Sequence, residues 1–181
     1  MSLEIERKFL VTGEYKSKSF AHYSIEQGYF DTAPGRTVRI RIRDEKAFLT
    51  IKGPSTNEGL SRYEFETEIP LEDGRQMMEL CRPGRIKKTR WLVKSGKHTV
   101  EVDEFFGDNE GLVVAEIELS SENEEYDKPD FLAEEVTGDP RYYNKCLMRL
   151  PYSLWKNNNQ QPTGHHTPTG GSCITISCKD S

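Results

Sequence analysis

The sequence predicts an α+β fold that is mainly β: a closed eight-stranded antiparallel β-barrel with a few peripheral helices. Two observations predict the sheet. Apolar and polar residues alternate along most of the chain up to Leu119, and short turns join the alternating segments. A third observation predicts closure, because the polar positions carry charges that a barrel would turn inward, leaving the apolar face to be covered by helices.

Eight segments carry this period of two, which is typical of strands with one apolar face. Connections such as 44–46 and 94–96 are short enough for hairpins, and hairpins join antiparallel neighbours, whereas parallel strands need long crossovers. The predicted strands are Leu3–Val11, His22–Asp31, Arg36–Arg43, Ala47–Gly53, Ser61–Ile69, Arg85–Leu92, His98–Phe105 and Leu112–Leu119.

Four segments are predicted to be helical, and we expect them to pack on the outer, apolar face of the barrel. The second has acidic residues in its first turn and the fourth has a proline near its start, both typical of helix N-termini. These segments are Gly13–Ser19, Leu71–Cys81, Pro129–Glu135 and Pro140–Met148.

The length of 181 residues is that of one domain, and 34% hydrophobic residues suffice for a compact core. We place this domain at residues 1–156. Residues 157–181 are rich in Asn, Gln, Pro, Thr and Gly, so we expect a low-complexity, flexible C-terminal tail.

Charge is nearly balanced, since 25 basic and 30 acidic residues give a net charge of −5. Proteins that bind nucleic acids usually carry a basic surface, so no nucleic-acid partner is expected. The sequence shows no apolar signal segment at its start and no stretch long enough to span a bilayer. We therefore expect no membrane association and a cytoplasmic location.

The charges are sorted by strand. Glu4, Glu6 and Lys8 share one face of the first strand, and the following strands carry either bases or acids at every second position. One interpretation is a sheet with a solvated face. The alternative, which we favour, is a functional lumen, because like charges on neighbouring strands cost stability that a bound ligand would offset.

These residue types suit a polyanion and divalent metal ions. Mg²⁺ and Mn²⁺ prefer carboxylate oxygens, and Lys and Arg side chains bind phosphate oxygens. Glu4, Glu6, Glu116 and Glu118 are the first choice of metal ligands, with Glu64, Glu66 and Asp103 as further candidates. The predicted phosphate-binding residues are Arg39, Arg41, Lys52, Lys88 and Arg90.

The segment Glu4-Ile5-Glu6-Arg7-Lys8 matches the ExExK signature of the CYTH superfamily, the triphosphate tunnel metalloenzymes. The chain resembles this superfamily to about Arg149, and most of all its short bacterial inorganic triphosphatases. The further motifs that follow in the family's order are Arg39-x-Arg41, Thr50-Ile51-Lys52-Gly53, Glu64-x-Glu66, Lys88-x-Arg90, Glu101-x-Asp103 and Glu116-x-Glu118. The resemblance implies a tunnel in which the basic residues hold triphosphate and glutamates of the first and last strands bind Mg²⁺ or Mn²⁺.

The resemblance also implies a catalytic pair. Gln27-Gly28-Tyr29 is similar to the segment in which a tyrosine pairs with the lysine of ExExK, which would make Lys8 and Tyr29 a dyad. The alternative is a lysine that binds phosphate and a tyrosine that only packs. Asn144-Lys145 resembles the segment near the tunnel mouth, with a plain helix surface as the alternative.

The function expected from this resemblance is metal-dependent hydrolysis of tripolyphosphate to pyrophosphate and phosphate. The same tunnel would also suit two organic triphosphates, with ATP cyclised by an adenylate cyclase reaction or thiamine triphosphate hydrolysed. A module that binds polyphosphate or nucleotide without turnover is the alternative outside enzymes. Whether the chain forms a homodimer is left open.

Overall fold

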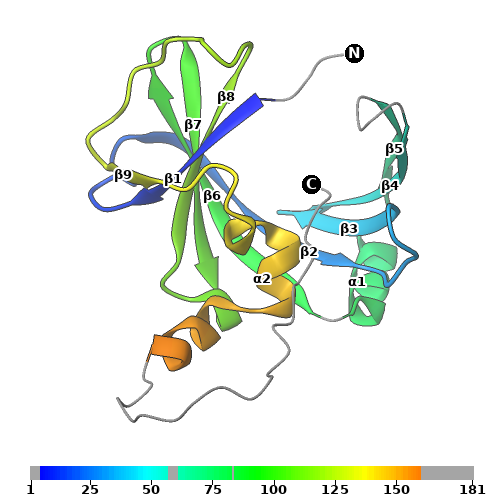
Figure 1. Ribbon diagram of the computed structural model, residues 1–181. Coiled ribbons are helices and arrows are strands. Elements are labelled where there is room, and N and C mark those ends of the chain that lie inside the picture. The colour runs from blue at the N-terminus through cyan, green and yellow to red at the C-terminus, as the bar shows by residue number, and fades with distance from the viewer. Residues whose placement is uncertain (1–4, 57–60, 83, 160–181) are drawn as a thin grey trace, which may run out of the picture.

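The described residues of the computed structural model are 5–56, 61–82 and 84–159. Their strands form one antiparallel sheet with the order β5-β4-β3-β2-β6-β7-β8-β1-β9, which confirms the mainly β prediction (Figure 1). All eight predicted segments form strands, and a ninth joins them. The strands are β1 (Ile5–Val11), β2 (Ser19–Tyr29), β3 (Thr37–Arg43), β4 (Lys46–Thr56), β5 (Ser61–Ile69), β6 (Arg85–Ser95), β7 (His98–Phe106), β8 (Val113–Leu119) and β9 (Leu132–Glu135).

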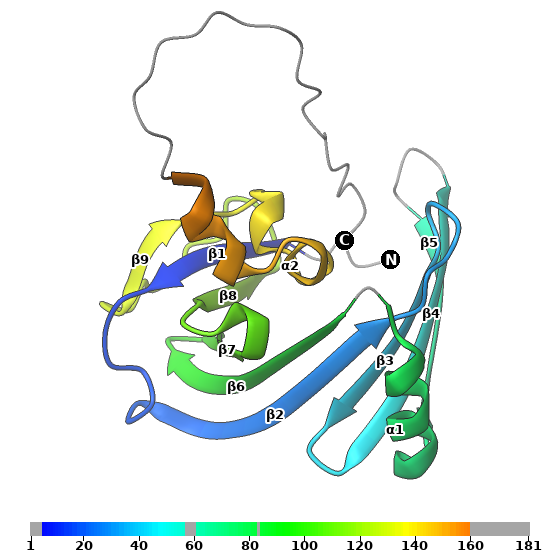
Figure 2. The same ribbon diagram turned by 90° about the horizontal axis from the view of Figure 1, so that it is seen from below.

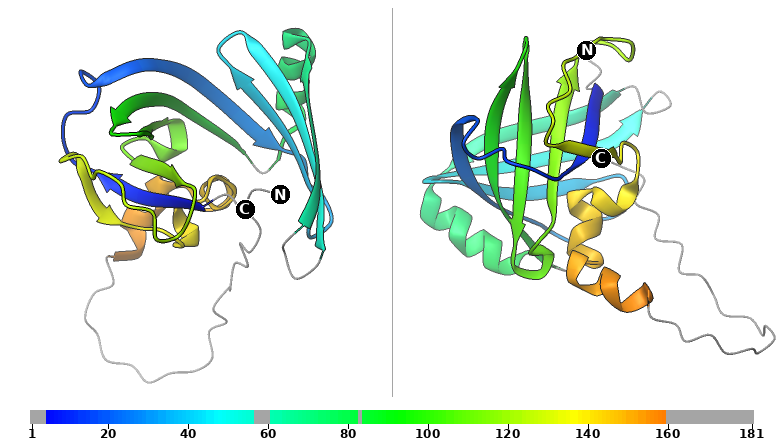
Figure 3. Two further views of the ribbon diagram at one scale, coloured as in Figure 1. Left: turned by 90° about the horizontal axis from the view of Figure 1, so that it is seen from above. Right: turned by 90° about the vertical axis from the view of Figure 1, so that its left-hand side faces the viewer.

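The sheet curves strongly around one concave face, as the end-on views show (Figures 2 and 3). It is not closed, so the predicted eight-stranded barrel is not seen among the described residues. Closure of eight strands would bring β5 against β1. Instead, part of that edge of β1 pairs with β9, where Phe9 lies opposite Glu135 and Val11 opposite Leu132.

Two of the four predicted helices are wrong. Residues 132–135 form β9, because the edge of β1 supplies backbone partners while Phe131 and Leu132 pack into the core. Residues 13–18 form a bend and a turn, in which the amides of Lys18 and Ser19 donate to carbonyls three residues earlier, and Ser19 already begins β2. The buried Tyr15 ring anchors this connection.

The other two predicted helices form, the last one in two pieces. Helix α1 (Leu71–Leu80) is as predicted, whereas the C-terminal segment divides into the 3₁₀ helix η3 (Pro140–Tyr142) and helix α2 (Asn144–Arg149). The break lies at Tyr143, whose extended backbone (φ −77°, ψ 138°) interrupts the helix. Two further 3₁₀ helices are η2 (Gly107–Asn109) and η4 (Tyr152–Asn159). None of the helices formed by the described residues has the length and apolar character needed to cross a bilayer.

The helices cover opposite faces of the sheet. Helix α1 lies outside β3 and β4, where Met78 packs against Ile40 and Gly74 allows close approach to Ala47 (Figure 2). Helix α2 instead packs at one end of the concave face, where Leu147 joins a cluster with Phe105. The sequence analysis expected all helices on the outer face. The position of α2 brings the segment 143–145 to the site.

Candidate functional site

A cavity of about 870 Å³ lies on the concave face of the sheet. Successive side chains of a strand point to opposite faces, so charges from seven strands, β1 and β3–β8, converge on it. This arrangement favours the functional lumen over a plain solvated face. The predicted site residues that line it are Glu6, Lys8, Tyr29, Arg39, Arg41, Lys52, Glu64, Glu66, Lys88, Arg90, Glu116 and Glu118. Of the other two, Asp103 is buried beside the cavity, and Glu4 lies outside the described residues.

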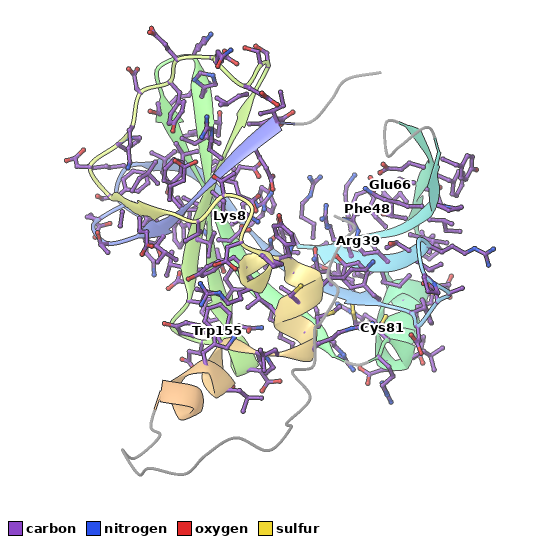
Figure 4. The ribbon with its side chains drawn as sticks, in the orientation of Figure 1. Lys8, Arg39, Phe48, Glu66, Cys81 and Trp155 are labelled. Carbon is purple, nitrogen blue, oxygen red and sulfur yellow. The ribbon has the colours of Figure 1, made fainter. Side chains whose placement is uncertain are left out.

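Lys8 and the predicted phosphate-binding cations belong to two groups on opposite arms of the curved sheet. One group lies on β3 and β4, and the other lies on β1 and β6. Lys8 on one arm and Arg39 and Glu66 on the other lie on either side of the concave space (Figure 4).

On the β3–β5 arm, carboxylates of the edge strand hold the bases. Arg39 Nη2 donates to Thr50 Oγ1 at 3.1 Å and to Glu66 Oε2 at 3.3 Å, and Lys52 Nζ pairs with Glu64 at 3.2 Å. The hydrogen bond from Thr50 lowers the pKa of Glu66, against the opposing effect of burial, and Arg39 lowers it further. Arg39 lines the cavity, and its Nε is buried without a hydrogen-bond partner among the described residues, so one donor of this guanidinium is unsatisfied.

On the β6–β7 arm, one buried aspartate holds two bases. Asp103 accepts from Lys88 Nζ at 2.5 Å and from Arg90 Nε and Nη2 at 2.7 Å each. Burial opposes ionisation of Asp103, but Lys88 and Arg90 outweigh it and hold the pKa at about 2. Burial and the neighbouring Arg90 lower the pKa of Lys88, although Asp103 opposes them. In this structure the oxygens of Asp103 are thus engaged by two cations, and its role as a metal ligand stays a prediction.

Lys8 is the best enclosed cation of β1. Its Nζ pairs with Glu116 at 2.9 Å and with Glu6 at 3.8 Å, and it lies 5.1 Å from the centre of the Tyr143 ring. Burial favours loss of its proton, but Glu116 and Glu6 outweigh burial and raise the Lys8 pKa. Lys8 is therefore an ammonium group at neutral and alkaline pH. No hydrogen bond joins it to Tyr29 among the described residues, so the dyad stays a prediction.

Carboxylates gather on β1, β7 and β8. In the strand register Glu6 lies opposite Glu118, and Glu101 lies opposite Glu116. Burial, together with Asp103 and Glu116, raises the Glu101 pKa despite the opposing effect of Arg90. Like charges opposite one another destabilise a sheet, so these pairs favour a cation between them. Arg90 supplies that cation for Glu101 and Glu116, since it forms ion pairs with both. Among the described residues no three His, Cys, Asp or Glu side chains already form a metal-binding group.

The cavity also contains residues that the sequence analysis did not assign to the site. Thr37 lies two residues before Arg39, so the strand alternation could have revealed it. Tyr143 carried no such signal, since it follows the last strand and reaches the cavity only because α2 packs on the concave face. Asn144 and Lys145, by contrast, are the two residues for which the sequence analysis weighed a position near the tunnel mouth against a plain helix surface. Both line the cavity, and Lys145 Nζ donates to Thr37 Oγ1 at 3.3 Å.

The β6–β7 hairpin lines one end of the cavity, where a single carboxylate holds several groups. Glu124 accepts from Ser120 Oγ at 2.7 Å, lies 3.2 Å from His98 Nε2 and forms an ion pair with Lys97. These contacts, that of Lys97 foremost, hold the Glu124 pKa well below its usual range. They fix the loop after β8 against the hairpin.

The sequence pattern of the CYTH domain matches residues 2–143. The chain belongs to the CYTH domain family. Among curated CYTH relatives, an inorganic triphosphatase of Acetivibrio thermocellus is 45% identical over 157 residues, which cover 86% of this chain and 99% of that protein. An inorganic triphosphatase of Nitrosomonas europaea is 34% identical over 80% of this chain and 95% of its own length.

A solved structure supports the CYTH assignment in three dimensions. The crystal structure of the inorganic triphosphatase NE1496 superposes with a TM-score of 0.65 at 30% identity, covering 82% of this chain and 95% of the other. The match therefore includes nearly all of that protein and most of this chain.

Proposed function

We propose that this CYTH protein hydrolyses inorganic tripolyphosphate to pyrophosphate and phosphate with the help of Mg²⁺ or Mn²⁺. The observation that carries the proposal is the cavity, in which two facing groups of cations lie beside paired carboxylates. Inorganic triphosphatases that match this chain over nearly their whole length support the choice of reaction.

The two groups of cations suit a linear polyanion. Arg39, Arg41 and Lys52 would bind phosphate oxygens from one arm, and Lys8, Lys88 and Arg90 would face the substrate from the other. The unpartnered Nε of Arg39 supports this role, because a phosphate oxygen would satisfy a buried donor that no described residue satisfies. Burial and the neighbouring Arg39 and Arg90 lower the pKa of Arg41, so a phosphate would also relieve repulsion among these cations.

The charge balance of the cavity supports divalent metal as a cofactor. Eight Lys and Arg side chains and seven Glu side chains line it, so the positive and negative charges of the described lining nearly balance. Additional cations are therefore needed to bind a polyanion. Glu6, Glu116 and Glu118 would hold the metal, together with Glu4 as predicted. Mg²⁺ is usually bound through one or two carboxylates, several waters and substrate phosphates, which fits a site where the described residues do not bring three such side chains together. When bound, the metal would neutralise phosphate charge and lower the pKa of a coordinated water.

The reaction places a water on a terminal phosphorus, forms a new P–O bond and breaks the bond to the bridging oxygen, so that phosphate and pyrophosphate result. Phosphoryl transfer needs mainly alignment and charge neutralisation, and the cations of both arms would provide these. Lys8, as an ammonium group, would neutralise charge on the reacting phosphate. Tyr29 lines the same cavity and would donate a hydrogen bond to a phosphate oxygen.

The lining favours an inorganic substrate over a nucleotide or thiamine compound. A nucleoside or thiamine group would need a stacking surface, and the aromatic rings among the described lining residues are those of Tyr29, Tyr143 and His98. Lys8 already lies over Tyr143, and Glu124 holds His98. The closed barrel belongs to the proposal as well: a polyanion between the two arms would draw them together.

Product analysis tests the function. Purified protein is incubated with tripolyphosphate, thiamine triphosphate or ATP, with Mg²⁺, Mn²⁺ or a chelator, and the products are separated by chromatography. We expect metal-dependent release of phosphate, fastest from tripolyphosphate. Faster formation of cyclic AMP or thiamine diphosphate would move the function to an organic triphosphate, and binding without any product would make the protein a binding module.

A further inference from the structure

Gln27 is a fully buried polar side chain between two residues of the site. It lies on β2, its fractional exposure is 0%, and its register partner on β3 is Arg41. Arg41 Nε donates to Gln27 Oε1 at 3.2 Å, and Gln27 Nε2 lies 3.3 Å from the hydroxyl of Tyr29, two residues along the same strand. One amide therefore connects a predicted phosphate-binding residue to the predicted catalytic tyrosine.

Chemistry fixes the direction of both hydrogen bonds. A guanidinium can only donate, so the atom of Gln27 that meets Arg41 must be its carbonyl oxygen. The amide nitrogen then faces Tyr29 and can only donate, so the tyrosine oxygen must accept. The proton of Tyr29 consequently points away from Gln27, and the Tyr29 side chain lines the cavity.

We infer that Gln27 is a positioning residue for the tyrosine hydroxyl. Its amide accepts a hydrogen bond from Arg41 and donates one to Tyr29, and this directed relay of two hydrogen bonds leaves the Tyr29 proton free to be donated to a phosphate oxygen of the substrate. This inference rests on the proposed function. The same amide holds the Nε edge of Arg41, which directs the outer nitrogens of that guanidinium toward the site. Burial strengthens the constraint, because breaking either bond would leave a polar group unsatisfied.

Replacing the donor nitrogen of residue 27 by an acceptor oxygen tests the relay. In Gln27→Glu the carboxylate still accepts from Arg41 but cannot donate to Tyr29, so the tyrosine proton turns toward residue 27 and away from the substrate. We expect kcat for tripolyphosphate to fall about tenfold or more, the loss expected for one hydrogen bond to a charged group, with KM little changed. Tyr29→Phe should show a similar loss.

The double variant separates positioning from packing. If Gln27 acts through Tyr29, then Gln27→Glu combined with Tyr29→Phe should be no slower than Tyr29→Phe alone. Gln27→Met, which has similar volume and releases both partners, should raise KM through Arg41 and lower kcat less than the glutamate does. It also provides a second test if the glutamate variant does not fold. Gln76→Glu, on the exposed face of α1, introduces the same charge away from the cavity and should keep wild-type kinetics.

Three results would overturn the inference, and the third is distinguishable from the first two. If the wild type hydrolyses tripolyphosphate but the losses from residues 27 and 29 multiply, Gln27 has only a structural role. The same holds if Gln27→Met, with a wild-type urea midpoint, also keeps wild-type kcat and KM. If the wild type itself does not turn over tripolyphosphate, the proposed function fails, and the relay fails with it.

Discussion

Replacing Asp103 by Asn removes the negative charge that holds Lys88 and Arg90 on the wall of the cavity. The shape of the side chain is retained, but two enclosed cations lose their shared counterion. Removing one partner of a buried ion pair typically costs about 3–5 kcal/mol, so we expect a loss of about this size in the free energy of unfolding at pH 7.

The pH dependence of this loss follows from the pKa of Asp103. Its folded-state pKa is about 2, against an ordinary value of 3.8, so its ionised form stabilises the fold by about 2 kcal/mol. Because the folded-state pKa is the lower one, this contribution is complete above about pH 4 and is lost as the pH falls toward about 2. The wild type should therefore lose this contribution over that range, and Asp103→Asn should not.

Urea unfolding monitored by tryptophan fluorescence measures both effects, at pH 7 and at steps below pH 4 at which unfolding remains cooperative. Asp108→Asn, at an exposed position in η2, which directly follows β7, is the matched control and should change stability by less than about 0.5 kcal/mol. If Asp103→Asn costs no more than this control and the two proteins lose stability in parallel below pH 4, the buried aspartate does not organise the two bases.

Three further predictions concern the cavity and its support. Arg39→Ala should raise KM for tripolyphosphate about tenfold or more in steady-state kinetics, because a charge-assisted contact is worth roughly 1.5–3 kcal/mol. The control Arg43→Ala changes the same strand outside the cavity lining and should leave KM unchanged. Glu118→Gln should raise the Mn²⁺ concentration for half-maximal activity about tenfold, and an unchanged metal titration would remove this residue from the ligands. Gly28→Ala would place a Cβ 2.6 Å from that of Cys81 and should cost about 1–3 kcal/mol in thermal unfolding, and a second change of Cys81 to Gly, which removes the clashing Cβ, should restore part of the loss.

The strands and the charges on their concave face were predictable from the sequence because side-chain direction depends on a local period of two. Arg39, Arg41 and Lys52 reach one cavity for that reason alone. Strand closure was not predictable, since local alternation does not say which edges pair. Residues 132–135 show the same limit: their sequence reads as helical, but the backbone of β1 and the core around Leu132 impose a strand.

The partners of the site residues depended on long-range register, which the sequence does not display. Asp103 belongs to an acidic motif, and only its position opposite Arg90 shows that it holds bases. Tyr143 reaches Lys8 through the packing of α2. Gln27 is polar and stands in an alternating strand, so nothing local distinguished it from a solvated residue before its burial was known.

Phosphorus NMR of the wild-type protein with tripolyphosphate tests the central claim most directly, because it follows substrate and both products in one sample. With Mg²⁺ or Mn²⁺ we expect the tripolyphosphate signals to be replaced by equal amounts of phosphate and pyrophosphate, and we expect no change when a chelator is present. Tripolyphosphate that stays intact with either metal, under conditions where the protein is folded and binds it, would contradict the proposed hydrolysis.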